Sequence, residues 1–348
     1  MQFLVVGCGS IGRRHTRNLR ELGVQDILVF DPDQERGARL AAECQAEQAT
    51  RLELAYAQRP EAALICAPTS LHLTLAKQAL RHNCHLFVEK PLSHNLEGVQ
   101  EFVREVEARG RVLLMGYNLR FDPLLHQLRA WLEESRIGHV ISARLHVGSY
   151  LPSWRPWEDY RGGYGANKSL GGGVILDASH ELDYALWLFG APDSVYCAGG
   201  KHSSLQIDVE DVAEIILSYD KSVISVHLDY VSPSPQRTCD VVGDDGQIHA
   251  DLIARKLMLF DKAARQWDPP HIYCPFDELY RIEMRHFLDC VAGKTSPAID
   301  SSATVASLRL ADAAKSSMTC GVPIVGSAST RWGAKLPNKG TSPDAYAQ

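Results

Sequence analysis

The chain opens with FLVVGCGSIG (residues 3–12), in which an apolar strand runs directly into a glycine-rich loop. A helical stretch follows over residues 13–22, and a second apolar strand over residues 27–30 ends at Asp31. In a dinucleotide-binding unit the first glycine permits a tight turn, the second lets the backbone approach a pyrophosphate, and the third lets the helix pack closely on the strand. The pyrophosphate then meets the free N–H groups and positive end of the helix. The segment predicts a nucleotide-binding Rossmann domain; the alternative is a structural glycine turn in a sheet of another purpose.

The carboxylate of Asp31 indicates which nucleotide binds. It follows Gly12 by nineteen residues, where an acid binds a ribose 2′-hydroxyl and repels a 2′-phosphate. Asp33 adds negative charge, whereas Arg36 is near enough in sequence to weaken the preference. We expect NAD rather than NADP as the cofactor, held in this region by Gly7, Gly9, Ser10, Ile11, Gly12 and Asp31.

A lysine stands at the end of another expected strand. The apolar run at residues 86–88 leads into Glu89, Lys90 and Pro91. Because ligand crevices in open α/β sheets form at the carboxyl ends of strands, Lys90 is placed like a catalytic group. The alternative is a surface lysine that caps a strand. The turn after residues 62–66 faces the same crevice, so the expected cofactor site also includes Pro68, Thr69, His72, Glu89 and Lys90.

The composition limits the class of protein. With 348 residues the chain is long enough for two domains, and its formal charge of −6 gives no electrostatic reason to expect nucleic acid. No segment reaches the ~18 apolar residues of a membrane span, and a strand beginning at residue 2 leaves no room for a signal peptide. The nine cysteines contain no CxxC pair, so we expect reduced thiols, no metal and a cytoplasmic protein.

The order of the expected elements predicts an α/β protein. Its first domain, residues 1–118, is a doubly wound parallel sheet, and its second, residues 119–326, carries an open-faced, largely antiparallel sheet. Residues 327–348 have the composition of a poorly packed tail. The pattern does not show which face of the second sheet is buried. The expected helices are 70–81, 95–109, 123–134, 177–188, 276–292 and 301–318, and the second-domain strands include 140–148, 213–219, 224–230, 237–243, 246–251 and 256–260.

A second cluster of chemistry-bearing residues lies in GGGVILDASHELD, residues 171–183. If residue 177 onward is helical, then Asp177, His180 and Asp183 share one stripe. A histidine flanked by carboxylates is suited to acid–base chemistry. A metal site and a satisfied structural histidine are the alternative interpretations.

The stretch SYLPSWRPWEDYRGGY, residues 149–164, mixes aromatic and basic side chains. Aromatic faces and guanidinium groups suit sugar rings and phosphates or carboxylates. A clamp at a domain or subunit interface is the alternative. The residues expected to bind substrate here are Trp154, Arg155, Tyr160 and Arg161, and together with Lys168 they favour an anionic sugar.

Five motifs together resemble the glucose–fructose oxidoreductase / inositol dehydrogenase / rhizopine catabolism (Gfo/Idh/MocA) family over residues 1–325. They are GCGSIGRRH (7–15), APTSLH (67–72), EKP (89–91), GYNLRF (116–121) and GGGVILDASHELD (171–183). The resemblance implies that Lys90 lies beside the nicotinamide, often with a cis bond to the proline. It also implies a second-domain sheet that pairs subunits into dimers or tetramers.

The same resemblance assigns residues of the second domain. It makes Asp177 and His180 the catalytic aspartate and histidine, although the family usually spaces them four apart and here the spacing is three. It matches Asp183 to an acid that contacts substrate, and Asn118 and Arg120 to positions near the substrate.

These observations predict an NAD-dependent oxidoreductase that transfers hydride between nicotinamide and a secondary hydroxyl of a sugar, sugar derivative or cyclitol. Nucleotide sugars and sugar acids are included in this class. His180 would take the hydroxyl proton, Lys90 would stabilise the developing alkoxide, and Asp177 would orient His180. The alternatives are an NAD-dependent glycosidase or lyase that acts by transient oxidation, and a non-catalytic nucleotide-binding protein.

Overall fold

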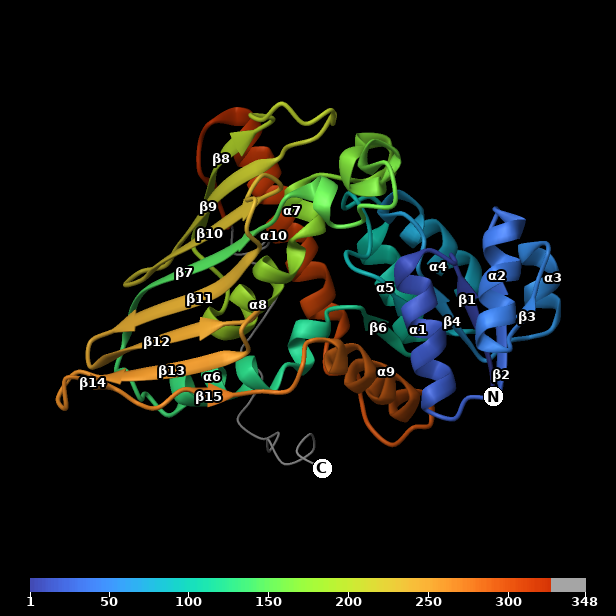
Figure 1. Ribbon diagram of the computed structural model, residues 1–348, viewed down its shortest axis with the longest axis horizontal. Coiled ribbons are helices and arrows are strands. Elements are labelled where there is room, and N and C mark those ends of the chain that lie inside the picture. Colours follow the sequence, from blue (N-terminus) through green and yellow to red (C-terminus); the bar gives the residue numbers. More distant parts are fainter. Residues whose placement is uncertain (327–348) are drawn as a thin grey trace. The chain divides into compact units, whose positions relative to one another are not determined.

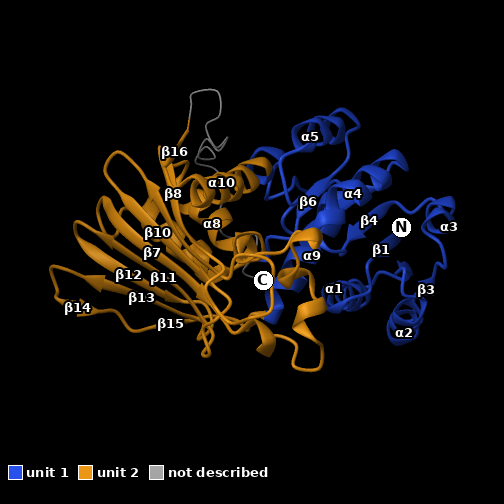
Figure 2. Cartoon of the chain, turned by 90° about the horizontal axis from the view of Figure 1, so that it is seen from above, with its two compact units in different colours: residues 1–118, 277–304 blue, residues 119–276, 305–348 orange. Residues whose placement is uncertain are grey.

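The computed structural model describes residues 1–326 (Figure 1). Its contacts divide the chain into two compact units, coloured separately in Figure 2. The first unit combines residues 1–118 with 277–304, and the second combines residues 119–276 with the described residues 305–326. The predicted tail, residues 327–348, lies outside the described residues.

The first unit is built on a six-stranded sheet of order β3-β2-β1-β4-β5-β6, with all neighbours parallel. This is the order of a dinucleotide-binding fold, in which the direction of winding reverses between β1 and β4. The central strands are apolar and fully buried, as parallel strands covered on both faces must be. The strands are β1 Gln2–Val6, β2 Asp26–Phe30, β3 Glu47–Gln48, β4 Ala62–Ile65, β5 His85–Val88 and β6 Leu113–Met115.

Helices of the first unit form two groups. One group consists of α1 (Ser10–Glu21), which packs against α2 (Gln34–Cys44) and α9 (Asp277–Val291). In the other, α4 (His72–Arg81) packs against α5 (Val99–Ala108). A short helix, α3 (Leu52–Ala57), precedes β4. Right-handed crossovers place such groups on opposite faces of a parallel sheet.

The position of α9 differs from the sequence prediction, which assigned residues 277–304 to the second domain. Phe287 of α9 instead lies against the rings of Phe3 and Phe87, with centroids 6.4 and 5.6 Å away. The apolar period of α9 predicts a helix, but a period cannot state which sheet the apolar face will cover. The first unit therefore takes a late segment of the chain to complete its core.

The second unit carries a ten-stranded sheet of order β14-β13-β12-β11-β7-β10-β9-β8-β16, with β15 paired to β13. Neighbouring strands are antiparallel except β7 and β10, which are parallel. The strands are β7 Val140–Gly148, β8 Ser194–Gly200, β9 Val212–Ser218, β10 Val223–Asp229, β11 Gln236–Gly243, β12 Gly246–Asp251, β13 Lys256–Asp261, β14 Gln266–Trp267, β15 His271–Ile272 and β16 Ile324–Val325.

Among residues 1–326, helices cover only one face of this sheet. Along β9 and β10 the buried side chains alternate with exposed or half-buried ones, as in Ala213, Ile215 and Leu217. Helix α8 (Ser179–Phe189) lies against β7, and α6 (Pro123–Glu133) lies against β12 and β13. Helix α10 (Ser301–Cys320) is tied to β8 by the Cys197 N–H, which donates to Ser317 Oγ at 3.0 Å. Within the same residues the opposite face is open.

The helix predicted over residues 177–188 is interrupted at its start. Helix α7 (Val174–Asp177) ends before Ala178, whose φ of −92° and ψ of 27° break the helix, and α8 begins at Ser179. The prediction that Asp177 shares a helical stripe with His180 is therefore wrong. His180 and Asp183 do lie on one helix.

Two further expectations concern the whole described chain. All nine cysteines fall within residues 1–326, and none forms a disulfide. No helix in this part of the chain combines the length and apolar character that crossing a membrane requires.

Candidate active site

The residues predicted to bind cofactor lie along one edge of the first sheet. Each follows the carboxyl end of a strand: the glycine loop follows β1, Asp31 follows β2, the turn at Pro68 and Thr69 follows β4, and Lys90 follows β5. Asn118 follows β6 at the same edge. The carboxyl ends of parallel strands lie at the same edge of the sheet, so residues from five places in the sequence come together there.

The glycine loop has the geometry of a phosphate-binding turn. Gly7 has φ +98°, and a Cβ there would lie 2.6 Å from the Cys66 carbonyl oxygen. A Cβ on Gly12 would lie 1.9 Å from the Gly7 carbonyl oxygen, whereas one on Gly9 would meet nothing within 4 Å among the described residues. Helix α1 starts without a side-chain cap and without an acid in its first turn. Its positive end is therefore available to a phosphate, and the loop fits a dinucleotide.

Asp31 is held firmly at the end of β2. It is 3% exposed, and its carboxylate accepts hydrogen bonds from the N–H groups of Cys8 (2.8 Å) and Asp33 (2.9 Å). The guanidinium of Arg36 lies 3.6 Å away and is half-exposed. Burial, and next the charge of Asp31, raise the pKa of the Cys8 thiol to about 12. The loop therefore presents a fixed negative charge and an unreactive thiol.

The segment after β5 is joined to its neighbours through buried histidines. The Lys90–Pro91 peptide bond is cis, as the resemblance implied. His72 is buried, and its ring nitrogens lie 2.8 Å from the Pro91 carbonyl oxygen and 2.7 Å from that of Ala67. His72 thus joins two of the loops at the edge where the cofactor site is predicted.

Two buried residues near Glu89, His15 and Glu283, were not predicted from the sequence. His15 of α1 lies beneath the loop with Nε2 2.6 Å from Glu89 Oε1, and both residues are buried. Glu283 of α9 is fully buried, and neither of its carboxyl oxygens has a hydrogen-bond partner within residues 1–326. Burial, and then the charge of Glu89, raise the pKa of Glu283 well above its usual range. A signal was present, because Glu283 interrupts an apolar i, i+4 row between Leu279 and Phe287.

Asn118 has the properties of a ligand-binding residue. Its side chain is 1% exposed, and neither the amide nitrogen nor the amide oxygen has a hydrogen-bond partner among the described residues. A buried amide without partners is costly. This observation supports the predicted position near the substrate.

In the second unit, two predicted substrate residues bind each other. Arg120 donates from Nε and from a terminal nitrogen to the two oxygens of Asp183, at 2.6 and 3.1 Å. Ser307 of α10 also donates to Asp183, at 2.7 Å, and the guanidinium of Arg120 lies over the ring of Trp187. Both members of the pair are buried. Arg120 is thus paired with Asp183 of α8. Sequence spacing could not show this pairing.

Asp177 is held by two tyrosines. Its carboxylate accepts hydrogen bonds from Tyr164 Oη at 2.5 Å and Tyr230 Oη at 3.0 Å. Burial, and next the charge of Asp177, raise the pKa of Tyr230 well above its usual range, so that hydroxyl remains a donor. His180 lies in the first turn of α8 and is partly accessible.

A pocket of the second unit brings most of the aromatic stretch together with Asp177. Its lining includes Trp154, Arg155, Tyr160 and Tyr164, with the acids Glu158, Asp159 and Asp177. Arg161 does not line it, because Asp159 binds its guanidinium at 2.7 to 2.9 Å. Glu158 and Asp159 are paired with the guanidinium groups of Arg155 (4.0 Å) and Arg161 (2.7 Å), and Asp177 accepts hydrogen bonds from tyrosines. Positive charge is therefore not in excess at this pocket, which favours a hydrogen-bonding ligand over an anionic one.

Comparison with known proteins identifies the class. Residues 1–117 match the family described as "Oxidoreductase family, NAD-binding Rossmann fold", and residues 125–249 match "GFO/IDH/MocA C-terminal domain". The class defined by fold and site is a two-domain oxidoreductase with an NAD-binding first domain. The chain belongs to the Gfo/Idh/MocA family.

Relatives of similar length share this organisation. The chain is 26% identical to scyllo-inositol 2-dehydrogenase (NAD(+)) of Bacillus subtilis, covering 92% of this chain and 94% of the relative. It is 27% identical to myo-inositol 2-dehydrogenase of Thermotoga maritima, covering 91% and 96%. Among solved structures, levoglucosan dehydrogenase in complex with NADH shares the fold with a TM-score of 0.83 at 18% identity, covering 93% and 98%.

Proposed function

We propose that this protein is an NAD-dependent dehydrogenase that oxidises a secondary hydroxyl of an uncharged cyclitol or sugar. The observation that carries the proposal is the pocket of the second unit, where aromatic rings and Asp177 line one cavity and the other two acids, Glu158 and Asp159, are paired with arginines. Carboxylates accept hydrogen bonds from the hydroxyls of a polyol and repel phosphates. The inositol dehydrogenases among the relatives support the same substrate class.

The roles of the residues follow from their chemistry. We assign the removal of the hydroxyl proton to His180, which begins α8, and a hydrogen bond to the same oxygen to Lys90. The unpartnered amide of Asn118 would bind a further substrate hydroxyl. Asp177 would act through the tyrosines it binds, Tyr164 and Tyr230, as a positioning residue. NAD, when bound, accepts the hydride, and the glycine loop and Asp31 would hold it.

The anionic substrates included in the sequence prediction are disfavoured by the same pocket. Arg161 is neutralised by Asp159, which leaves Arg155 as the guanidinium of the lining. An NAD-dependent lyase or glycosidase differs in outcome, because a transient oxidation produces no net NADH.

Turnover assays test these assignments. NADH absorbance would be followed with scyllo-inositol, myo-inositol and unphosphorylated sugars, beside a sugar phosphate and a nucleotide sugar. We expect net NADH with an uncharged polyol, and a loss of turnover of about 10²-fold or more in Lys90→Ala and in His180→Ala. Both variants should still bind NAD. Lys221→Ala and His139→Ala, which change exposed residues of the same types, serve as controls.

Three outcomes contradict the proposal. Unchanged turnover in both Lys90→Ala and His180→Ala excludes the assigned roles. Net NADH only with the charged sugars excludes the substrate class. Product without net NADH identifies the lyase or glycosidase instead.

The open face of the second sheet leads to a proposal about assembly. Tyr196, Val223 and Val242 are between 38% and 49% exposed on strands of this sheet. We propose that a second copy of the chain covers this face in a homodimer or homotetramer, and that the protein works in the cytoplasm, where its nine thiols stay reduced. Sedimentation of wild type and of Val223→Glu would test the assembly, and a monomeric wild type would exclude it.

A further inference from the structure

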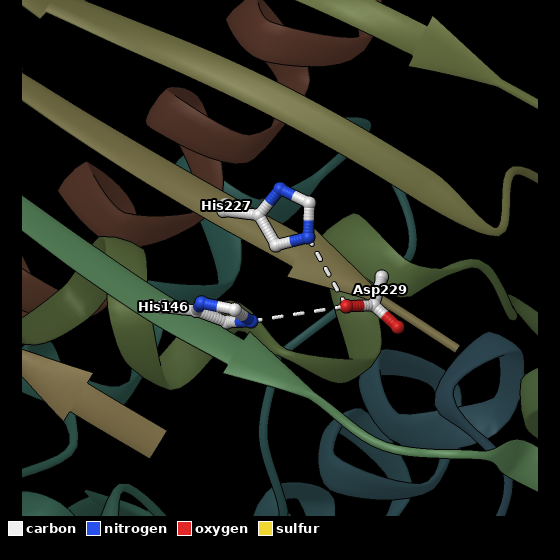
Figure 3. Close-up of side chains that lie close together, drawn as sticks. All are labelled: His146, His227 and Asp229. Carbon is white, nitrogen blue, oxygen red and sulfur yellow. Dashed lines mark hydrogen bonds and ion pairs between the residues drawn. The ribbon is translucent and has the colours of Figure 1, made fainter. Parts of the chain in front are cut away.

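Two histidines and an aspartate meet on the open face of the second sheet (Figure 3). His146 of β7 and His227 of β10 are direct partners across the parallel pair, and Asp229 follows His227 by two residues on the same face. The centroids of the two imidazole rings are 4.6 Å apart. Asp229 Oδ2 lies 3.1 Å from His227 Nε2 and 3.9 Å from His146 Nε2. One potential ligand atom from each residue lies within 4.8 Å of the others.

The orientation of His146 points to a missing ligand. Its Nε2 atom is buried and has no hydrogen-bond partner among the described residues, although it faces the carboxylate of Asp229 (Figure 3). A buried ring nitrogen without a partner is unfavourable. A cation between His146 and Asp229 would satisfy it and would draw the three side chains together.

The surrounding residues fix the ligand atoms. Glu214 of β9 lies directly opposite His227 and binds its Nδ1, which directs Nε2 toward Asp229. A carboxylate that binds the outer nitrogen of a histidine is the usual support of a metal-bound imidazole.

The carboxylate of Asp229 is anchored by the turn after β10. It accepts hydrogen bonds from the N–H groups of Val231 (2.7 Å) and Ser232 (2.6 Å) and from Ser232 Oγ (2.7 Å). Gly148 lies opposite Asp229 on β7, and a Cβ there would come within 2.2 Å of Oδ2. The glycine therefore leaves the space that this carboxylate occupies.

We propose that His146, His227 and Asp229 bind a divalent transition-metal ion of the Zn²⁺ class. Two imidazole nitrogens and one carboxylate oxygen suit such an ion, and water completes its shell on the open side of the sheet. The ion would join β7 to β10, the parallel pair at the centre of the sheet, and its role is structural.

The test uses the full chain, without a polyhistidine tag and stripped of metal with a chelator. Zn²⁺ binding is measured by calorimetry, and Co²⁺ binding by its visible absorption. We expect one ion per chain. The loss of a supporting carboxylate weakens metal binding by about 10- to 100-fold, so Glu214→Gln should fall in this range and His146→Ala and His227→Ala should lose at least as much.

Matched variants keep the result interpretable. His249 of β12 pairs with Asp240 at 2.6 Å on the same sheet, but that pair belongs to no group of three potential ligands among residues 1–326. His249→Ala should bind metal like wild type. His146→Gln serves where the alanine variant folds poorly, as judged by circular dichroism.

Two results would overturn the proposal. One is a wild-type protein that binds no Zn²⁺ at a hundred micromolar metal; the space would then hold only the proton that His227 shares with Asp229. The other is equal affinity in wild type and in folded His146 and His227 variants, which would place the ion elsewhere.

Discussion

Several buried carboxyl groups have different partners in the two units. In the second unit three buried acids each bind an arginine through two nitrogens, at distances between 2.6 and 3.1 Å. The pairs are Asp122–Arg255, Glu181–Arg237 and Asp183–Arg120. In the first unit Glu89 binds a histidine, His15, and Glu283 is buried with no hydrogen-bond partner within the described residues.

The difference distinguishes acids that hold the structure together from groups that can take part in a reaction. Arginine stays charged at any working pH, so an acid that it binds through two nitrogens is held in a fixed geometry. Histidine and a protonated glutamate do respond to pH. The second unit thus gains a rigid frame for its pocket, whereas the first unit places titratable groups beneath the loop that holds Lys90. Asp183, which the resemblance matched to an acid that contacts substrate, is one of these arginine-paired acids.

The largest effect is expected from breaking one arginine pair. Asp183→Asn leaves the Arg120 guanidinium buried without its counter-charge, and such changes cost about 3–5 kcal/mol of unfolding free energy. Urea unfolding measures it. Glu133→Gln is the control, because its pair with Arg129 is exposed and should contribute less than about 1 kcal/mol. If Asp183→Asn keeps wild-type stability but loses substrate affinity, the residue is a substrate ligand after all.

A smaller effect, visible only as a pH dependence, is expected from Glu283→Gln. Because the pKa of Glu283 is raised in the folded protein, the folded state holds a proton that the unfolded state releases above its ordinary pKa. The stability of wild type should therefore fall as the pH rises through this range, by at most about 1.4 kcal/mol per pH unit. Glu283→Gln removes this slope. Unfolding free energies measured as the pH is raised above the ordinary glutamate pKa of ~4.3 show the change.

Glu278→Gln provides the control for that experiment. It makes the same chemical change on the same helix at an exposed position, where Glu278 pairs with Arg281. Its stability should follow pH as wild type does. Parallel curves for Glu283→Gln and Glu278→Gln would show that Glu283 carries a charge in the folded protein.

The smallest effect concerns cofactor choice at the edge of the first sheet. Asp31→Ser removes the carboxylate that repels a 2′-phosphate, while Arg36, 3.6 Å from it, remains to attract one. We expect the ratio of kcat/KM for NAD to that for NADP to fall about tenfold, which corresponds to about 1.4 kcal/mol. Asp26→Ser is the control, because Asp26 is an exposed aspartate at the opposite end of β2 from Asp31. An unchanged ratio in Asp31→Ser would refute the ribose assignment.

Much of the first unit could be predicted because its signals are local. The strand, glycine loop, helix and acid of residues 2–31 follow one another directly. Each expected cofactor residue comes after a strand that can be predicted from its run of apolar residues. The edge of a parallel sheet then brings them together without further information. The same reasoning failed at residue 178, because a one-residue break between α7 and α8 leaves no mark in the polar–apolar pattern.

The sequence by itself determined the family, the nucleotide-binding loop and the residue types available for acid–base chemistry. Only the tertiary structure decided which of them have partners. It bound Arg120 to Asp183, buried Glu283 beneath the first sheet, and set His146 beside His227 across 81 residues of chain. The physical reason is that local spacing fixes helices, strands and turns, whereas pairing between distant residues depends on strand order and register, which arise from the packing of the whole chain.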